Sequence, residues 1–241
     1  MPTNADRFLD SFKAIEDHLR QARGAADRTD FVELVAQAAL DNPAVRAHQD
    51  RLTRYARLRN AIVHHASDSR RRAIAEPRRD VVEDIEAIRL VVTKPPLLTD
   101  IVGGKVTVCL PTDPILSAAR KMAAGDFSQL PVYEDGRVVD VLTSEAVALW
   151  VTTRLAGGQS VDGDSPVSEV VAADEDRLHR VVDRRATVVE ALEMFEEAHE
   201  QGRILQAIIV MRSKASRSVA GIATVADVPA LVRSLRPKRR G

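Results

Sequence analysis

The chain of 241 residues has little aromatic content and almost no cysteine: 3% of its residues are Phe, Tyr or Trp, and Cys109 is its one cysteine. A single cysteine excludes any disulfide within the chain. Because aromatic rings are few, Val, Leu, Ile and Ala must fill the hydrophobic cores, and the apolar fraction of 45% suffices for that. Cys109 lies in an apolar run, where we expect it to be a small buried side chain.

Long apolar runs are also absent. No stretch approaches the roughly 20 residues that a membrane helix needs, and the first residues, from Met1 to Asp6, lack the basic segment and apolar core of a signal peptide. We therefore expect a soluble, cytoplasmic protein with no membrane partner.

Several catalytic signatures are missing. The chain has no Gly-x4-Gly-Lys-Ser/Thr loop and no Gly-x-Ser-x-Gly elbow, and Gly103-Gly104 precedes an apolar run instead of following one. These absences argue against a phosphate-binding loop, a serine-hydrolase elbow and a dinucleotide-binding fingerprint. No grouping of His, Cys and acidic residues predicts a metal site, and no cofactor is expected to be required.

Charge of one sign is lacking overall, because 35 Lys and Arg balance 35 Asp and Glu. The whole chain is therefore no obvious polyanion binder. Arginines do gather between Arg46 and Arg79, and the tail after Arg236 is basic. A local basic surface can meet RNA or a nucleotide, although arginines on a helix are most often simply solvated.

The N-terminal segment shows helical periodicity. Phe8, Phe12, Ile15 and Leu19 recur at spacings of four, three and four, and Gly24 follows that run. The spacing places the four apolar side chains on one stripe, and glycine is the usual residue just past a helix end. The pattern predicts an amphipathic helix that packs in a bundle.

Three more helices are predicted before residue 95. Thr29 or Asp30 caps the second, and Pro43 starts a long third helix that runs from about 44 to 65. The fourth follows Pro77. The side chains predicted to face inward on the third helix are Val45, Leu52, Tyr55, Leu58 and Ile62. Those of the fourth are Val81, Val82, Ile85, Ile88 and Leu90.

Pro95-Pro96 is a domain boundary, since two prolines cannot continue a helix. Short β-like runs then alternate with helices, and Asp135-Gly136 between two apolar runs predicts a hairpin. The order strand, helix, strand, strand, helix occurs twice, as an internal repeat of about 60 residues. The predicted strands are 106–110, 129–133, 138–142, 180–183, 207–211 and 219–223, and the predicted helices are 114–124, 144–155, 188–200 and 225–235.

The repeated segments resemble CBS domains. The first copy contains Phe127-Ser-Gln-Leu-Pro-Val-Tyr133 followed by Asp135-Gly-Arg-Val-Val-Asp-Val-Leu-Thr143. The second contains Gln206-Ala-Ile-Ile-Val210 followed by Val219-Ala-Gly-Ile-Ala-Thr-Val-Ala-Asp227. The resemblance implies an α+β chain in which an N-terminal all-α bundle precedes a tandem CBS pair of two β-α-β-β-α repeats. The expected domains are 1–94, 97–156 and 166–236.

In CBS pairs, clefts between the repeats bind adenine nucleotides. The resemblance implies AMP, ATP, S-adenosylmethionine or cyclic di-AMP as a regulatory ligand. The family's Gly-x-x-Thr-x-x-Asp pattern is matched by Gly221, Thr224 and Asp227. Thr224 would lie near a helix start, where phosphate is favoured, and Asp227 would accept from the ribose hydroxyls. Backbone groups near Ala207 and Ile208 would read the adenine edge.

The first copy departs from this pattern. Asp140 stands where glycine is usual and Ala146 where the ribose-binding Asp is expected, while Thr143 is retained. A standard nucleoside site is not expected there, though Thr143 is kept as a candidate phosphate contact. The competing interpretation is that Thr143 and Thr224 only cap helices and that Asp227 is an ordinary first-turn acid.

Within the third helix, Leu58-Arg-Asn-Ala-Ile-Val-His-His65 resembles the Arg-x4-6-His motif of HEPN domains, which are small helical bundles that often dimerise. The resemblance implies a homodimer and, in active members, metal-independent cleavage of RNA. Arg59 would hold the phosphate, His64 would move the proton, and Asn60 would orient the imidazole. Arg54 and Arg57 would add phosphate contacts.

Two functions therefore stay open. In the first, a CBS pair senses an adenine-type nucleotide and controls or assembles a HEPN-like domain that has no chemistry of its own. In the second, that domain is a ribonuclease regulated by the CBS pair, with RNA as partner. The pattern does not decide between a sensor and an enzyme.

Overall fold

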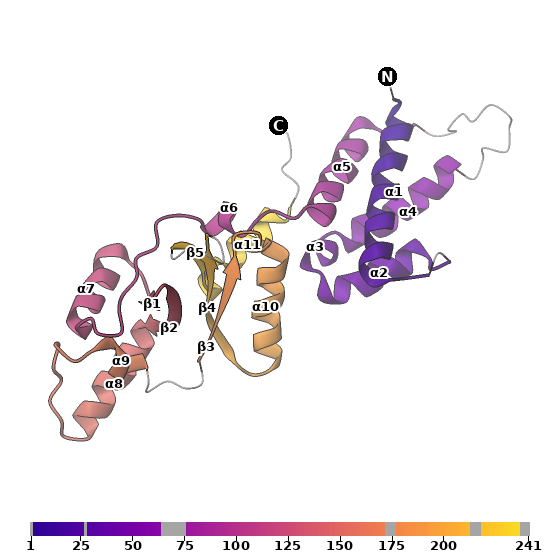
Figure 1. Cartoon of the computed structure of the whole chain (residues 1–241). Helices are drawn as coiled ribbons and strands as arrows, with labels where there is room; N and C mark the ends of the chain where they lie inside the picture. The colour runs from indigo at the N-terminus through magenta and orange to yellow at the C-terminus, as the bar shows by residue number, and fades with distance from the viewer. Residues whose placement is uncertain (1, 27, 64–75, 172–176, 213–217, 237–241) are drawn as a thin grey trace. The chain divides into compact units, whose positions relative to one another are not determined.

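The computed structural model describes residues 2–26, 28–63, 76–171, 177–212 and 218–236 (Figure 1). Their contacts divide the chain into two compact units, which we name the helical unit and the repeat unit. The helical unit comprises Met1–Pro96, Thr187–Glu193 and Ala230–Gly241, and the repeat unit comprises Leu97–Ala186 and Met194–Pro229. The chain thus returns to the helical unit twice after first leaving it.

Among the described residues before Pro95, five helices lie in the helical unit (Figure 1). They are α1 (Asn4–Arg23), α2 (Phe31–Asp41), α3 (Pro43–Arg46), α4 (Gln49–Val63) and α5 (Arg79–Thr93). Long stretches of contact join α1 to α5, while α2 packs on α1, α3 and α4. An all-α bundle before residue 95 was predicted, and this part of the fold is confirmed.

Helix α1 forms where the sequence predicted it. The Thr3 hydroxyl accepts from the Asp6 N–H and the Asp6 carboxylate accepts from the Thr3 N–H, a reciprocal cap that satisfies two free donors at the helix start. Gly24 follows with φ 57°, a left-handed conformation that ends the helix at little cost for glycine. The predicted stripe is buried: Phe8, Phe12, Ile15 and Leu19 are all at most 3% exposed.

The third predicted helix is wrong in one respect. It is two helices, α3 and α4, separated at Ala47 and His48. The start at Pro43 is as expected, and the Asn42 side chain caps it by accepting from the Val45 N–H at 3.1 Å. The predicted extension to His65 falls beyond residue 63, outside the described residues.

One apolar cluster fills the core of the helical unit. It includes edge-on contact of Phe8 with Tyr55, whose ring centroids are 5.6 Å apart, and a tilted pair of Phe12 with Phe31 at 4.2 Å. Leu90, predicted to face inward, is instead 52% exposed, and Val92 takes the inward position near the end of α5. The residues α5 contributes to the cluster are Val82, Ile85, Ile88 and Val92.

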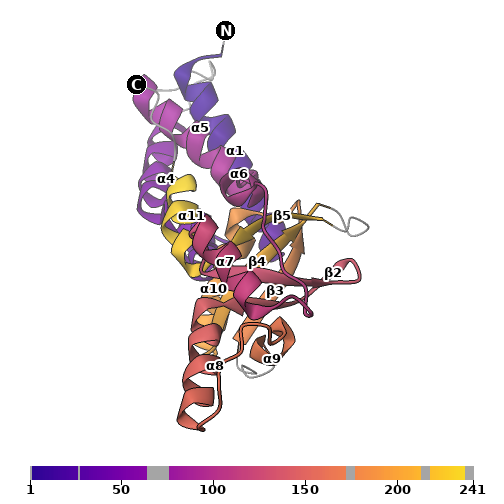
Figure 2. The same cartoon turned by 90° about the vertical axis from the view of Figure 1, so that its left-hand side faces the viewer.

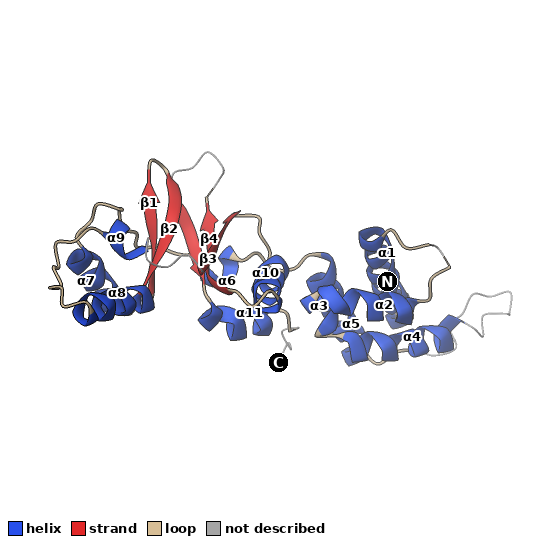
Figure 3. Cartoon of the chain, turned by 90° about the horizontal axis from the view of Figure 1, so that it is seen from below, coloured by secondary structure: helices blue, strands red, loops and turns tan. Residues whose placement is uncertain are grey.

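The strands of the repeat unit form two small sheets (Figure 3). In the first, β1 (Gln129–Glu134) pairs antiparallel with β2 (Arg137–Thr143). In the second, the central strand β4 (Ile204–Met211) pairs in parallel with β3 (Arg177–Asp183) and antiparallel with β5 (Val219–Ala223). The hairpin predicted from Asp135-Gly136 is confirmed, since both residues have positive φ, 47° and 85°, as a tight hairpin turn requires.

α-Helices and one 3-10 turn lie before, between and after these strands. In chain order they are α6 (Thr99–Val102), α7 (Ile115–Gly125), α8 (Ser144–Ala156), α9 (Val167–Val171), α10 (Val188–Glu200), the 3-10 turn η1 (Val225–Asp227) and α11 (Val228–Ser234). The predicted α7, α8 and α10 are confirmed. Neither α6 nor α9 was predicted, and the last helix opens as a 3-10 turn before it becomes α-helical.

The predicted strand 106–110 is wrong. Among the described residues of this run only Cys109 pairs, in an isolated parallel bridge with Val132. The Cys109 N–H donates to Pro131 O at 3.1 Å and the Tyr133 N–H donates to Cys109 O at 2.8 Å. One bridging residue lies at the edge of the first sheet, and its neighbours do not extend the ladder.

The two sheets pack face to face within the repeat unit. Val141 of β2 meets Ala207, Ile209 and Met211 of β4 in one apolar cluster. A separate cluster lies between the first sheet and α7, α8 and α9, and includes Cys109, Leu130, Leu142 and Trp150. Ala207, Ile209 and Met211 alternate along β4, so these three side chains lie on the face of the strand that contacts the first sheet.

Each repeat also receives the segment that precedes the other one (Figure 2). Beyond α6, which comes before the first repeat, the Gly104 N–H donates to Ala220 O of β5 at 3.0 Å. At α9, which comes before the second repeat, the Val167 N–H donates to Asp113 O at 3.0 Å. The leading segments are therefore exchanged, and neither repeat is complete from contiguous residues alone.

Candidate functional site

The turn between β5 and α11 carries the Thr and Asp of the predicted nucleotide site. Thr224 follows the last residue of β5 in an extended conformation, with φ −126° and ψ 173°, and η1 begins directly after it. The Asp227 Oδ2 accepts from the Thr224 N–H at 2.8 Å and from the Thr224 hydroxyl at 3.0 Å. The structure thus brings the two predicted residues together on one turn, where they hold each other.

These bonds define what the turn can offer a ligand. Oδ2 of Asp227 is occupied, whereas Oδ1 makes no hydrogen bond within the part of the chain that the structure describes. The first N–H groups of a helix have no acceptor inside it, and here Val225 and Ala226 hold those positions at an exposed turn. One carboxylate oxygen and a pair of N–H groups therefore have hydrogen-bonding capacity left at this turn, a combination that suits hydroxyl donors beside an anion.

Gly221 serves a close approach of two backbones. A Cβ built on it would lie 2.7 Å from the Val102 carbonyl oxygen and 3.4 Å from the Gly103 Cα. Gly103 and Gly221 also form an antiparallel bridge. The glycine of the Gly-x-x-Thr-x-x-Asp pattern is thus explained by the segment after α6, which it allows to lie against β5.

Ala207 and Ile208 lie in the central strand β4 and are both 0% exposed. Ile208 is opposite Ala223 of β5, the residue before Thr224. On the other side, Ala207 pairs with His179 of β3. The strand register therefore places both residues beside the Thr224 turn. That their backbone groups read an adenine edge stays a prediction.

The first repeat holds Thr143 in a different role. Its side chain is 3% exposed and accepts from the Ala146 N–H at 3.0 Å, so it caps α8. Asp140 is partly buried within β2 and its Oδ1 accepts from the Val141 N–H at 2.7 Å. Ala146, where the ribose-binding acid would stand, is buried. The turn after β2 thus presents no carboxylate corresponding to Asp227.

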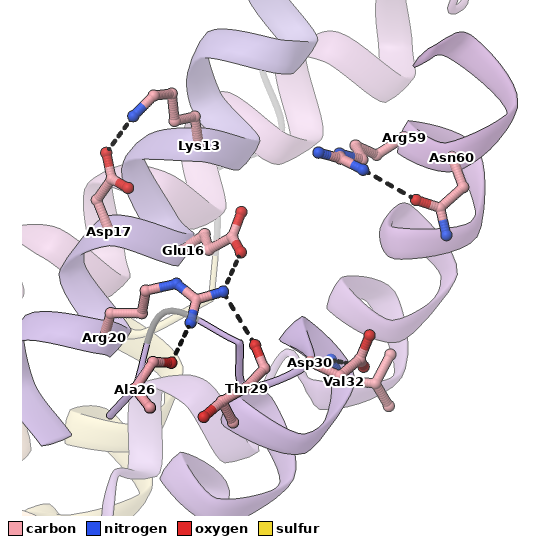
Figure 4. Close-up of polar contacts among 10 residues, drawn as sticks. All are labelled: Lys13, Glu16, Asp17, Arg20, Ala26, Thr29, Asp30, Val32, Arg59 and Asn60. Carbon is pink, nitrogen blue, oxygen red and sulfur yellow. Dashed lines mark hydrogen bonds and ion pairs between the residues drawn. The ribbon is translucent and has the colours of Figure 1, made fainter. Parts of the chain in front are cut away.

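The end of α4 carries the other predicted site. Arg59 Nη1 donates to the Asn60 Oδ1 at 3.2 Å, and Figure 4 shows both side chains on this helix. The Asn60 oxygen is thus engaged by its neighbour. His64, the third member, lies outside the described residues. The catalytic roles assigned to these residues stay predictions.

Polar contacts at the other end of the bundle are structural. The Arg20 guanidinium donates to Glu16 at 2.6 Å and to the carbonyl oxygens of Ala26 and Thr29, at 2.7 and 2.9 Å (Figure 4). The Asp30 carboxylate then caps α2 by accepting from the Val32 N–H at 2.8 Å. These bonds fix the loop between α1 and α2, and they identify Asp30, not Thr29, as the cap.

His48 is a buried polar residue that the sequence did not point to. Its side chain is 2% exposed and lies at the break between α3 and α4. Nε2 is 2.8 Å from the Leu235 carbonyl oxygen, and Nδ1 has no hydrogen-bond partner among the described residues. Burial lowers the pKa of His48 below its ordinary value of 6.5. No signal in the sequence could have identified it, because its partner lies 187 positions further along the chain.

Burial also raises the pKa values of Cys109 and Tyr55. Burial of Cys109 raises the pKa of its thiol to about 12, which keeps the thiol protonated and unreactive. Burial and a 2.6 Å hydrogen bond to Asp84 raise the pKa of Tyr55.

The described residues contain no group of three or more His, Cys, Asp or Glu side chains arranged to hold a metal ion. In the same residues, no helix is both long and apolar enough to cross a membrane.

Comparison with known families places one recognised domain in this chain. The CBS domain family matches residues 81–152, a range that starts within α5 and ends within α8. The chain therefore contains a CBS domain, and the α+β fold with an N-terminal helical part and a repeated β unit is confirmed. A search of curated protein sequences finds no match.

Several solved structures are similar to this chain. Hypoxic Response Protein I, solved with two coordinated zinc ions, is 25% identical, covering 56% of this chain and 97% of its own, at a TM-score of 0.41. A CBS domain pair in complex with 5-methylthioadenosine and S-adenosyl-L-methionine is 18% identical, covering 57% and 95%, at 0.42. An acetoin utilization protein from Vibrio cholerae is 18% identical, covering 58% and 91%, at 0.43.

Proposed function

We propose that this protein is a regulatory sensor whose repeat unit binds an adenine nucleotide at the turn formed by Thr224 and Asp227. The CBS domain in the chain and the geometry of that turn support the proposal. The observation that carries it is that Asp227 bonds Thr224 through Oδ2 alone, beside the exposed residues Val225 and Ala226 of η1. The helical unit would carry the output, as a domain that the repeat unit controls or assembles, with a homodimer as the expected form.

In this proposal each group at the turn has one task. The Asp227 Oδ1 accepts from ribose hydroxyls, and the exposed N–H groups of Val225 and Ala226 donate to phosphate oxygens. Thr224 keeps the carboxylate in place through the two bonds it donates to Oδ2. Thr224 is thus a support for Asp227 in the free protein, because its hydroxyl proton is already used. The backbone near Ala207 and Ile208 is assigned to the base.

Thermal unfolding of the full chain with AMP, ATP, S-adenosylmethionine and cyclic di-AMP tests the proposal. A ligand that binds only the folded state at 100 times its Kd should raise the Tm by roughly 5 to 10 °C for a chain of this size. No shift with any of the four ligands would contradict the proposed function.

Two variants test the role assigned to Asp227. Asp227→Ala removes the acceptor, and we expect the nucleotide-induced Tm shift to disappear. Asp227→Asn keeps an oxygen for the bonds from Thr224 but places an NH2 group, which cannot accept, toward the ligand. We expect it to lose most of the shift while folding normally.

Asp164→Ala is the matched control. It removes the same charge from an exposed side chain in the linker between the repeats. Its nucleotide-induced Tm shift should equal that of the wild type. If Asp227→Asn and Asp164→Ala show equal, full shifts, the ribose role of Asp227 is wrong.

A further inference from the structure

The C-terminal helix belongs to both units. α11 begins at Val228, directly after Asp227, and its residues from Ala230 onward are part of the helical unit. Leu231 and Leu235 are 0% and 1% exposed. Leu231 and Leu235 are therefore packed in place, and one short helix leads from the candidate nucleotide turn into the helical unit.

Within the helical unit, His48 holds that segment. The His48 N–H donates to Val45 O, and its carbonyl oxygen accepts from the Leu52 N–H, both at 3.0 Å, so its backbone joins α3 to α4. Its side-chain Nε2 lies 2.8 Å from Leu235 O. Since a carbonyl oxygen can only accept, Nε2 carries the proton. Nδ1 is buried without a partner among the described residues, so the contact with Leu235 is the one hydrogen bond that the ring makes there.

We propose that His48 is a positioning residue that clamps the end of α11 in the helical unit, and that α11 transmits nucleotide binding at the Thr224–Asp227 turn to the junction of α3 and α4. Binding at the turn orders the start of α11, while the clamp fixes its end. A ligand can bias the helical unit only if it prefers the clamped or the released arrangement, and the clamp supplies those two states.

The clamp itself is tested without ligand, by hydrogen–deuterium exchange on the full chain. In the wild type, peptides covering 43–52 and 230–236 should be protected. His48→Ala should raise exchange in both by about two- to tenfold, the range expected for one buried hydrogen bond. His48→Gln should restore protection, because its amide nitrogen can donate to Leu235 O. The control His199→Ala, at an exposed position in the last turn of α10, should change neither peptide.

A second variant approaches the contact from the other side. Leu235→Ala keeps the carbonyl acceptor but removes a side chain that is 1% exposed. It should raise exchange at 43–52 even if His48→Ala fails to fold. Unchanged exchange at 43–52 in Leu235→Ala, or equal exchange in His48→Ala and the wild type, would overturn the clamp.

Transmission rests on the proposed function and is tested with AMP and ATP. In the wild type a nucleotide that raises the Tm should also lower exchange at 43–52, and His48→Ala should lose the second effect but keep the first. A Tm shift without any change at 43–52 overturns transmission and leaves the nucleotide site standing. If neither nucleotide binds, the proposed function and transmission both fail, and the exchange measured without ligand still decides the clamp.

Discussion

At the scale of single residues, the absence of a side chain at Gly221 permits a backbone contact that any larger residue would block. Gly221 lets the backbone of Val102 and Gly103 lie against β5. A motif search finds this glycine because it belongs to a recognised spacing, but the reason for it comes from a segment more than a hundred residues away. The sequence predicted the residue, and only the fold gives its cause.

Gly221→Ala should therefore lower the stability of the repeat unit. Its Cβ would lie 2.7 Å from a backbone oxygen that cannot rotate away, so one of the two segments must shift. We expect a loss of about 1–3 kcal/mol in the free energy of unfolding, measured by urea denaturation. Gly104→Ala is the control, because nothing lies within 4 Å of its Cβ position. Equal stability of the two variants would contradict the close approach.

His48 makes a second prediction at this scale, on pH. Burial lowers its pKa below 6.5, the nearby Arg51 lowers it further, and the Leu235 bond and Asp84 oppose the shift. Above pH 6.5 the ring is neutral in both the folded and the unfolded chain. Below it, the unfolded chain takes up a proton that the folded ring resists, so stability falls by up to about 1.4 kcal/mol per pH unit until the folded pKa is reached.

His48→Gln should remove this part of the pH dependence. Denaturant titrations of wild type and variant at several pH values between 5 and 7 measure it, and the exposed His199→Gln should behave as the wild type. Parallel stability profiles for His48→Gln and the wild type would show that the buried ring does not titrate in this way.

At the scale of elements, local patterns predicted most of the longer helices, although the third predicted helix is two helices, α3 and α4. α1 follows from its apolar spacing and from Gly24, α8 and α10 recur in the repeated order of elements, and the β1–β2 hairpin follows from Asp135-Gly136. The run 106–110 was misassigned because a short apolar run suits several environments, and here only Cys109 bridges a strand. The break before α4 has no glycine or proline at Ala47 or His48 to signal it.

The alternative output is a ribonuclease, for which Arg59 of α4 is one of the predicted residues. If Arg59 and His64 act as the Arg-x4-6-His resemblance implies, the full chain should cleave single-stranded RNA in EDTA. Arg59→Ala and His64→Ala should then each lower the rate by at least about a hundredfold, the usual effect of losing a proton-transfer or charge-stabilising group. Lys13→Ala, which removes an exposed basic side chain of α1 that has no assigned role, is the control. Intact RNA in the wild-type sample would remove this function and leave the sensor.

At the scale of the whole molecule, the repeat was visible in the sequence and its exchange of segments was not. The recurring order of strands and helices predicted two similar halves. Neither α6 nor α9 was predicted, because four or five residues carry too little periodicity to identify a helix. The candidate site was likewise predictable only in part: Thr224 and Asp227 follow from a spacing, whereas the contact of His48 with Leu235 joins positions that no local pattern connects.

The exchange of leading segments also limits the order in which native contacts of the repeat unit can form during translation. The residues after α6 emerge early, but the Gly104 N–H has its acceptor only once Ala220 has been synthesised. The segment around α9, by contrast, finds Asp113 and its neighbours already made. Contacts between positions far apart in the sequence form slowly, and the segment made first stays unpaired until its partner has been made. The segment after α6 is therefore translated early in the repeat unit, but it should be one of the last segments to form its native contacts.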